Sequence, residues 1–227
     1  MKLTHLLNNS LPYHAFLYEG RSTPVICVDV QPEYSGMNDG DENPVFEDII
    51  QFVNNQTGPV LMYVNAEDQG LTGDTVQDVK AYWEHTVRGE AWDPEDHDEH
   101  DAPINWNRFQ IVDKGYGYLR SWMDHGIPAA TIIKTIRMMY QQKVNSSEDL
   151  TFPKFSARTP EMVDIKHTID EMDGDAISVN WVSVAQLKRF SGAYIVGGGR
   201  NECLREVELL MNAFNIKYKR IDSLVYG

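Results

Sequence analysis

The stretch that most constrains the fold runs from Ala193 to Lys219 and reads as a strand, a tight turn and a helix. Its opening run, Ala193-Tyr194-Ile195-Val196, is short and apolar throughout, as in a strand buried on both faces of a parallel sheet. The three glycines at 197–199 then let the backbone turn sharply. Apolar residues recur at helical spacing from Leu204 to Phe214. The pattern predicts an α/β fold in which this unit carries a buried strand.

Cys203 falls in the first turn of the predicted helix, with Asn201 as a possible N-cap. The unpaired N–H groups and the positive dipole end of a helix N-terminus favour a thiolate. Arg200 is close enough in sequence to add to the effect. Cys203 is therefore a candidate nucleophile, and a small buried hydrophobic cysteine is the alternative interpretation.

A second apolar run, Pro24 to Val30, contains a single charge, Asp29, near its carboxyl end. Its β-branched residues predict a central strand. In an open α/β sheet, the ligand crevice lies outside the carboxyl ends of the strands. We therefore interpret Asp29 as a site residue, with a solvated acid at the end of a strand as the alternative.

The remaining pattern places a helix between two apolar runs, which is a βαβ unit and implies parallel pairing. We expect one domain over residues 1–227, built as a three-layer, doubly wound, mainly parallel sheet with helices on both faces. A helical hairpin insertion is expected over about 104–144, and a left-handed C-cap at Asn215. The expected strands cover 24–30, 60–64, 162–169, 193–196 and 216–221, and the expected helices 44–54, 74–87, 106–124, 128–144, 179–190 and about 203–214.

The chain carries a formal net charge of −14, which argues against a partner that is itself a polyanion. A small-molecule substrate or a protein partner fits better, and we expect a small-molecule substrate with no nucleic-acid or membrane partner. We also predict no cofactor. The only two cysteines, Cys27 and Cys203, do not indicate a disulfide framework. With no apolar stretch of membrane-span length and no signal-peptide pattern, the sequence predicts a cytoplasmic protein. The aromatic and methionine content of the hairpin suggests packing against the sheet domain or against a second subunit, and ordinary core is the favoured interpretation. We expect a homo-oligomer.

Residues 90–101 form an acidic run in which seven of twelve residues are Asp or Glu and two are His. Such mixed oxygen and nitrogen ligands are found in metal sites. The spacing is poor for a preformed site, however, and acidic runs are usually solvated surface loops. We interpret the run as a loop and predict no metal site.

Two motifs resemble the isochorismatase-like cysteine hydrolases, the superfamily that includes nicotinamidases and N-carbamoyl amidases. In that family the first strand ends in an Asp followed two residues later by Gln, as in Asp29-Val30-Gln31. A later strand ends in Gly, a cis peptide bond follows, and a nucleophilic Cys lies six residues beyond the Gly. Gly197 and Cys203 reproduce that offset.

The resemblance also implies a Lys at the end of the third strand, and two residues compete for this role. Lys166 lies in the run that we expect to form that strand, whereas Lys154, in Pro153-Lys154-Phe155-Ser156, has the more similar local sequence. Lys166 is preferred because its place on a strand fixes where its amine can reach.

The sequence departs from the family in its turn, where three glycines replace a mixed sequence and Arg200 stands where Thr or Ser is common. The zinc-binding members carry Asp-x-His after the second strand. Asp98-Glu99-His100 matches those letters but lies too far downstream.

The resemblance implies hydrolysis of a C–N bond of the amide type through a thioester, with Asp29, Lys166 and Cys203 as catalytic residues. Substrate contacts are then expected at Gln31 and, in the turn, at Gly198, Gly199, Arg200 and Asn201. Two alternatives stay open. The first is an inactive binding or assembly protein of the same fold. The second is a Mg²⁺-dependent phosphodiesterase or nuclease that uses the acids Asp29, Glu67, Asp68 and Asp74.

Overall fold

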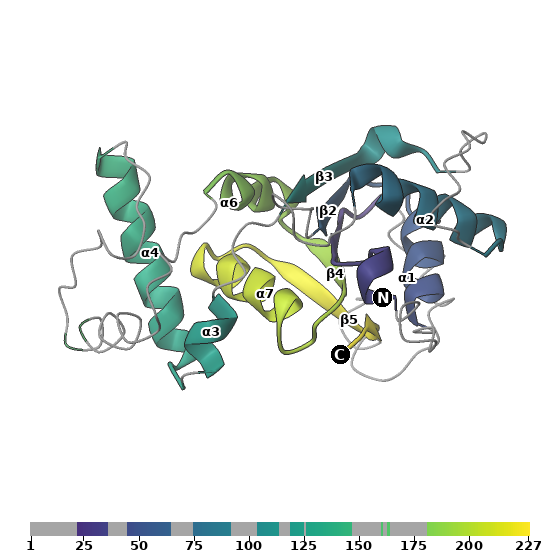
Figure 1. The fold of residues 1–227 in the computed structure, drawn as a ribbon. Helices are drawn as coiled ribbons and strands as arrows, with labels where there is room; N and C mark the ends of the chain where they lie inside the picture. Colours follow the sequence, from purple (N-terminus) through teal and green to yellow (C-terminus); the bar gives the residue numbers. More distant parts are fainter. Residues whose placement is uncertain are drawn as a thin grey trace, which may run out of the picture. The chain divides into compact units, whose positions relative to one another are not determined.

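The sheet has five strands, all parallel, in the order β3-β2-β1-β4-β5 (Figure 1). The computed structural model describes residues 22–35, 45–64, 75–91, 104–113, 119–124, 126–146, 160, 163 and 181–227. The strands are β1 (Val25–Val28), β2 (Val60–Val64), β3 (Phe109–Asp113), β4 (Ala193–Gly197) and β5 (Tyr218–Val225). β2 and β3 lie on one side of β1, and β4 and β5 lie on its other side. The winding therefore reverses between β1 and β4, and the predicted α/β fold with a parallel sheet is confirmed.

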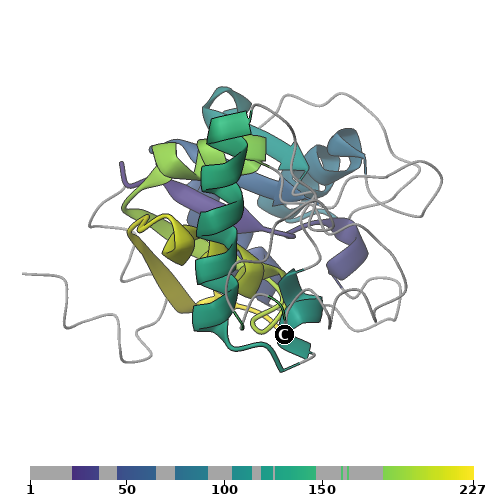
Figure 2. The ribbon, with the colours of Figure 1, turned by 90° about the vertical axis from the view of Figure 1, so that its left-hand side faces the viewer.

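The helices alternate with the strands along most of the chain. They are η3 (Pro32–Tyr34), α1 (Val45–Asn54), α2 (Val76–Arg88), η4 (Trp106–Arg108), α3 (Leu119–Asp124), α4 (Ala129–Ser146), α6 (Trp181–Leu187), η6 (Lys188–Phe190) and α7 (Cys203–Ala213). The turned view shows α4 as one uninterrupted helix (Figure 2). No helix among the described residues is long and apolar enough to cross a membrane.

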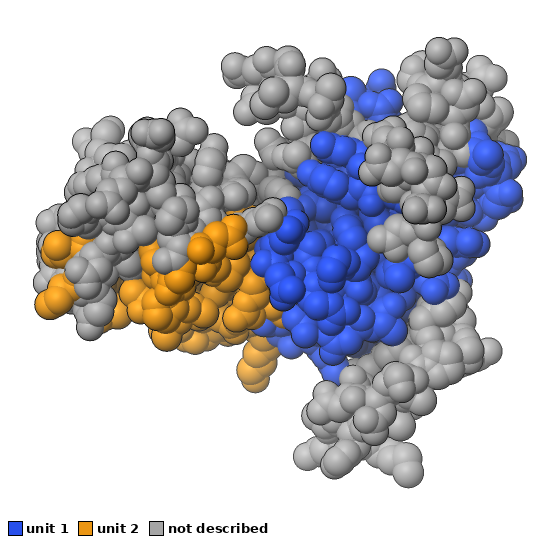
Figure 3. Space-filling view, turned by 60° about the horizontal axis from the view of Figure 1, so that its bottom comes forward, with its two compact units in different colours: residues 1–113, 190–204, 218–227 blue, residues 114–189, 205–217 orange. Residues whose placement is uncertain are grey.

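The chain separates into two compact units (Figure 3). Unit 1 consists of residues 1–113, 190–204 and 218–227 and contains the whole sheet with α1 and α2. Unit 2 consists of residues 114–189 and 205–217 and contains α3, α4, α6 and most of α7.

The core of unit 1 forms where α1 and α2 pack beside each other and against residues of one face of the sheet. Apolar residues spaced three or four apart give α1 its buried side, as the sequence predicted. At its start, α2 has a capping box between Thr75 and Asp78, and at its end a left-handed Gly89. The strand side chains in this core are Val25, Cys27, Val60, Met62, Val64, Tyr194, Val196, Ile221 and Leu224.

The residues that alternate with these along the central strands are equally inaccessible. Ile26, Leu61 and Ile195 have no exposed surface. Strands buried on both faces are typical of parallel sheets, which explains why β1, β2 and β4 read as continuous apolar runs.

Unit 2 is held together by cationic side chains that reach across its helices. Arg137 of α4 donates to the carbonyls of Asn212 and Ala213, at the end of α7. Lys188 donates to the hydroxyl of Tyr140 and lies over the rings of Tyr140 and Phe214. Asn215 is left-handed, with φ of 54°, as predicted for the C-cap.

The helix predicted over 106–124 is wrong in its first half. Residues 109–113 form β3, which pairs with β2 from Phe109 opposite Val60 to Asp113 opposite Val64. Elsewhere in the described part of that range, 106–108 form the 3-10 helix η4 and 119–124 form α3. The strand predicted over 162–169 lies outside the described residues except for Val163, which is helical.

Arg108 fastens the start of β3 to the connection between α1 and β2. Its guanidinium donates to the carbonyl oxygens of Val53, at 2.6 Å, and Gly58, at 3.1 Å, and lies over the ring of Phe109. Val53 is in the last turn of α1, where carbonyls lack partners within the helix. Arg108 therefore caps α1 and anchors an edge strand with one side chain, and burial lowers its pKa.

We predict that Arg108→Ala lowers the free energy of unfolding by about 1–3 kcal/mol, because two carbonyls lose a charged donor. Arg220→Ala is the control, since Arg220 pairs with the exposed Asp222, and exposed pairs contribute about 0–1 kcal/mol. Urea denaturation followed by circular dichroism measures both. Equal losses for the two variants would contradict the anchoring role.

Candidate functional site

A cavity of about 210 Å³ opens where the carboxyl ends of β1 and β4 meet, at the reversal of the winding. Ligands of open α/β sheets bind in this place, because the loops that leave the two strands diverge there. All the lining residues belong to unit 1. They are Asp29, Tyr34, Gly199, Arg200, Asn201, Glu202, Cys203, Tyr226 and Gly227.

Asp29 follows β1 directly and is 1% exposed. Its N–H continues the sheet by donating to the carbonyl of Tyr63 at 2.9 Å. Its φ is 51°, a left-handed conformation that Asp tolerates better than most residues. The chain therefore leaves the sheet abruptly at Asp29, and the prediction of a deep acid at the end of a strand is confirmed.

The turn after β4 needs glycine because its backbone lies against β1. Gly197 has φ of 107°, and a Cβ atom there would lie 2.1 Å from the carbonyl oxygen of Val28. The next N–H, that of Gly198, donates to the same oxygen at 2.8 Å. This close approach joins the ends of the two strands that carry the site.

Cys203 is the first residue of α7, is partly buried and lines the cavity. The thiol is thus at a helix N-terminus, as the sequence predicted. The helix begins at Cys203 itself, so Glu202 rather than Asn201 occupies the N-cap position. Among the described residues no peptide bond is cis, so the cis bond that the resemblance implies after Gly197 is not found.

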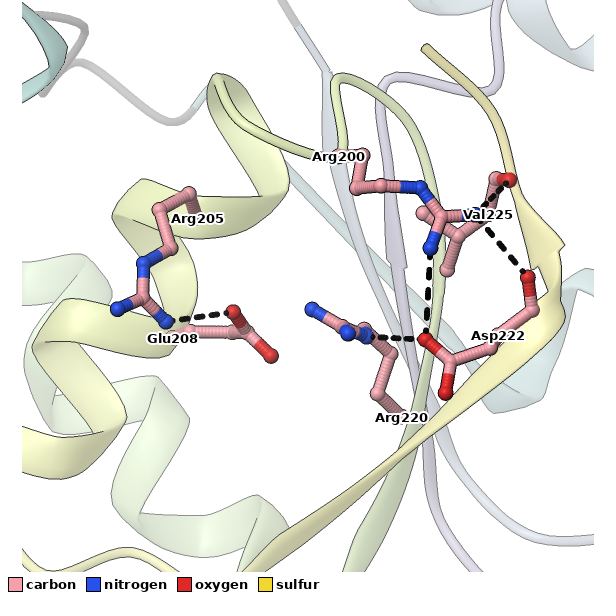
Figure 4. A network of polar contacts seen from close by, with 6 residues as sticks. All are labelled: Arg200, Arg205, Glu208, Arg220, Asp222 and Val225. Atoms are coloured by element: carbon pink, nitrogen blue, oxygen red, sulfur yellow. Dashed lines mark hydrogen bonds and ion pairs between the residues drawn. The ribbon is translucent and has the colours of Figure 1, made fainter. Parts of the chain in front are cut away.

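Arg200 lines the cavity, but its guanidinium is bound to the end of β5 (Figure 4). It donates to the carbonyls of Asp222 and Val225 and forms an ion pair with the carboxylate of Asp222 at 3.6 Å. Arg220 contacts the same carboxylate. The sequence predicted that the Arg200 guanidinium acts on Cys203, whereas its hydrogen bonds and ion pair are made to β5. Figure 4 also draws the pair Arg205–Glu208, which is a contact within α7.

Tyr226 is a lining residue that sequence reasoning missed. Its hydroxyl donates to the carbonyl of Asp29 at 2.6 Å, and its ring packs at 4.7 Å from that of Phe46. Burial raises the pKa of Tyr226 strongly, and the charges of Asp29 and Cys203 add to the shift. The predicted last strand stopped at Ile221, whereas β5 continues through Val225. The β-forming residues Leu224 and Val225 were the available signal.

Two of the expected substrate contacts do not line the cavity. Gln31 is fully buried at the start of η3. Gly198 lies under the ring of Tyr226, and a Cβ there would be 1.6 Å from the Cζ atom. Gly199, Arg200 and Asn201 do line it.

Several other predicted residues lie outside the described part of the chain. They include both candidate lysines, the acids at 67, 68 and 74, and residues 92–101 of the acidic run. Among the residues that are described, no cluster of three or more His, Cys, Asp or Glu is arranged to hold a metal ion.

Cys27 differs from Cys203 in burial and in its place in the fold. It is fully buried in β1, and burial, with a further contribution from the charge of Asp29, raises its pKa well above the usual range. Cys27 is thus a core residue and a natural control for Cys203.

The chain was compared with protein-family models, curated proteins and solved structures, and nothing matched. The interpretation of the site therefore depends on its own residues.

We predict that Gly197→Ala destabilises the protein by about 3 kcal/mol or more. The new methyl group would overlap the backbone of Val28, and the φ angle at this position is unfavourable for any residue with a side chain. Gly192 is the matched control, since its φ is 88° and no atom lies within 4 Å of the position that a Cβ would take. Gly192→Ala should cost only about 1 kcal/mol. Thermal unfolding of both variants measures the difference, and equal costs would show that the close approach is unimportant.

Proposed function

We propose that this chain is a cysteine-dependent hydrolase that cleaves a C–N bond of the amide type in a small molecule. One observation carries the proposal: Asp29, which follows β1, and Cys203, at the start of the helix after β4, line the same cavity, and β1 and β4 are neighbouring strands. They are two of the three catalytic residues that the resemblance to isochorismatase-like hydrolases implies; the third is a lysine. The proposal includes the three-layer arrangement of that family. The homo-oligomer, the absence of a cofactor and the cytoplasmic location stay predictions of the sequence.

In the first half of the proposed reaction, the carboxylate of Asp29 accepts the proton of the Cys203 thiol. The sulfur then forms a bond to the carbonyl carbon of the amide. The tetrahedral intermediate collapses with cleavage of the C–N bond, and the amine leaves with the proton that Asp29 returns. The acyl group remains on Cys203 as a thioester.

In the second half, a water molecule gives a proton to Asp29 and attacks the thioester carbon. The C–S bond breaks, the carboxylic acid leaves and the sulfur recovers its proton. Backbone N–H groups at the start of α7 would stabilise the oxyanion in both halves. The N–H groups of Gly198, Arg200 and Glu202 donate to Val28, Tyr226 and Gly199 respectively, so we assign this role to the N–H groups of Gly199 and Asn201.

The position of β3 in the chain supports a proposal about the catalytic lysine. The resemblance expects a Lys at the end of the third strand, and among the described residues the third strand is β3, which ends at Asp113. The next residue in the sequence is Lys114. We therefore propose Lys114 for the role that the sequence assigned to Lys166 or Lys154.

We predict that Cys203→Ala and Asp29→Asn each abolish hydrolysis of a panel of small neutral amides, with losses of roughly a thousandfold or more for Cys203→Ala and about a hundredfold or more for Asp29→Asn. Release of amine measures the rate. Cys27→Ala, the matched cysteine control, should change the rate by less than about threefold.

Mass spectrometry after iodoacetamide treatment at neutral pH should find Cys203 modified and Cys27 intact. If no amide is hydrolysed and Cys203 reacts slowly, the enzyme proposal fails and an inactive binding protein of this fold becomes the better interpretation.

We further predict that Lys114→Ala lowers kcat about a hundredfold, because a cation that stabilises the thiolate is lost. Lys154→Ala and Lys166→Ala should remain within about threefold of the unchanged protein. The same amide assay compares the three variants. A large loss in either of the latter two, with Lys114→Ala active, would return the assignment to that residue.

A further inference from the structure

We propose that Tyr226 is a positioning residue that holds Asp29 in its left-handed conformation at the cavity. The role of Asp29 rests on the proposed function. The evidence that Tyr226 positions Asp29 comes from the hydrogen bonds of Tyr226 to backbone atoms. These bonds join the carboxyl ends of β1, β4 and β5.

The first contact of Tyr226 is with Asp29, the residue that it positions. Asp29 turns away from the sheet at φ of 51°, so its carbonyl no longer follows the direction of the strand. A buried carbonyl needs a donor. The hydroxyl of Tyr226 supplies one at 2.6 Å. Burial and nearby negative charge raise the pKa of Tyr226, which favours the protonated hydroxyl that donates this hydrogen bond.

The other contacts fix the ring itself. The N–H of Tyr226 donates to the carbonyl of Gly197 at 3.3 Å, and its carbonyl accepts from the N–H of Arg200 at 2.9 Å. The ring fills the space beside Gly198 that a side chain there would occupy. Tyr226 is therefore held by the turn that leads to Cys203 while it holds Asp29. This arrangement explains why Gly198 bears no side chain.

These contacts give Tyr226 a function that packing alone does not require. A phenylalanine would fill the same space and contact Phe46 equally well. The hydroxyl is what reaches Asp29, so removing that one atom separates positioning from packing.

The test uses Tyr226→Phe, with Tyr140→Phe as the control. Tyr140 also has a hydrogen-bonded hydroxyl, to Lys188, but does not line the cavity. If the amide assay detects activity, Tyr226→Phe should lower kcat about tenfold, with KM changed less than about twofold. Tyr140→Phe should leave both unchanged.

A second measurement does not depend on activity. The rate of Cys203 alkylation by iodoacetamide is followed against pH in the unchanged protein, Asp29→Asn and Tyr226→Phe. Removing the negative charge of Asp29 favours the thiolate, so its midpoint should move to lower pH. Tyr226→Phe should move it in the same direction by a smaller amount. The other titratable groups that line the cavity, Tyr34, Arg200 and Glu202, are the same in all three proteins.

A Tyr226→Phe midpoint that coincides with that of the unchanged protein, or moves oppositely to that of Asp29→Asn, overturns the proposal. So does an Asp29→Asn midpoint that does not move, since Asp29 would then have no effect on the thiol. If Tyr226→Phe does not fold, Gly198→Ala displaces the ring and should give the same shift. Failure of both to fold would assign Tyr226 a structural role only. Absence of amide hydrolysis with the alkylation shift present would refute the proposed function and support the positioning role.

Discussion

The contact between the backbone of Gly197 and that of Val28 determines where the other parts of the site lie. Because no side chain separates β4 from β1 at this point, the Gly198 N–H reaches the Val28 carbonyl and the two strand ends stay in register. The residues that follow β1 and β4 then run in different directions from this contact. Asp29 on one side and the turn to Cys203 on the other consequently border a single cavity.

The three consecutive glycines, which looked like a departure from the family pattern, correspond to packing demands in this chain. Gly197 accommodates β1 and Gly198 accommodates the ring of Tyr226. Arg200 then binds the end of β5, which carries Tyr226. A mixed turn with a larger residue at 198 would have no room for this aromatic side chain. The turn and the end of β5 therefore depend on each other's sequence.

The sequence predicted the central strands well because strands buried on both faces leave an unambiguous apolar run. It failed at β3 because Phe109 and Val112, counted with Tyr116 and Leu119, also fit a helical period, and β3 is only partly buried. The lysine assignment depended on counting strands, and it stays a prediction because Lys154 and Lys166 lie outside the described residues. Asp29 and Cys203 were found from local position alone. Tyr226 was not, because its role comes from contacts with residues distant in sequence, which no local pattern encodes.

The charges around the cavity limit the chemistry that it favours. Among the lining residues that the structure describes, Asp29 and Glu202 are acidic and Arg200 is the one cation, and its guanidinium is turned to Asp222 and β5. A carboxylate beside a thiol disfavours the thiolate unless a cation compensates. The proposed mechanism therefore requires a lysine in addition to Arg200, and it is more compatible with a neutral amide than with an anionic substrate. This requirement makes the lysine, more than the cysteine, the residue whose identification separates a hydrolase from an inactive protein of the same fold.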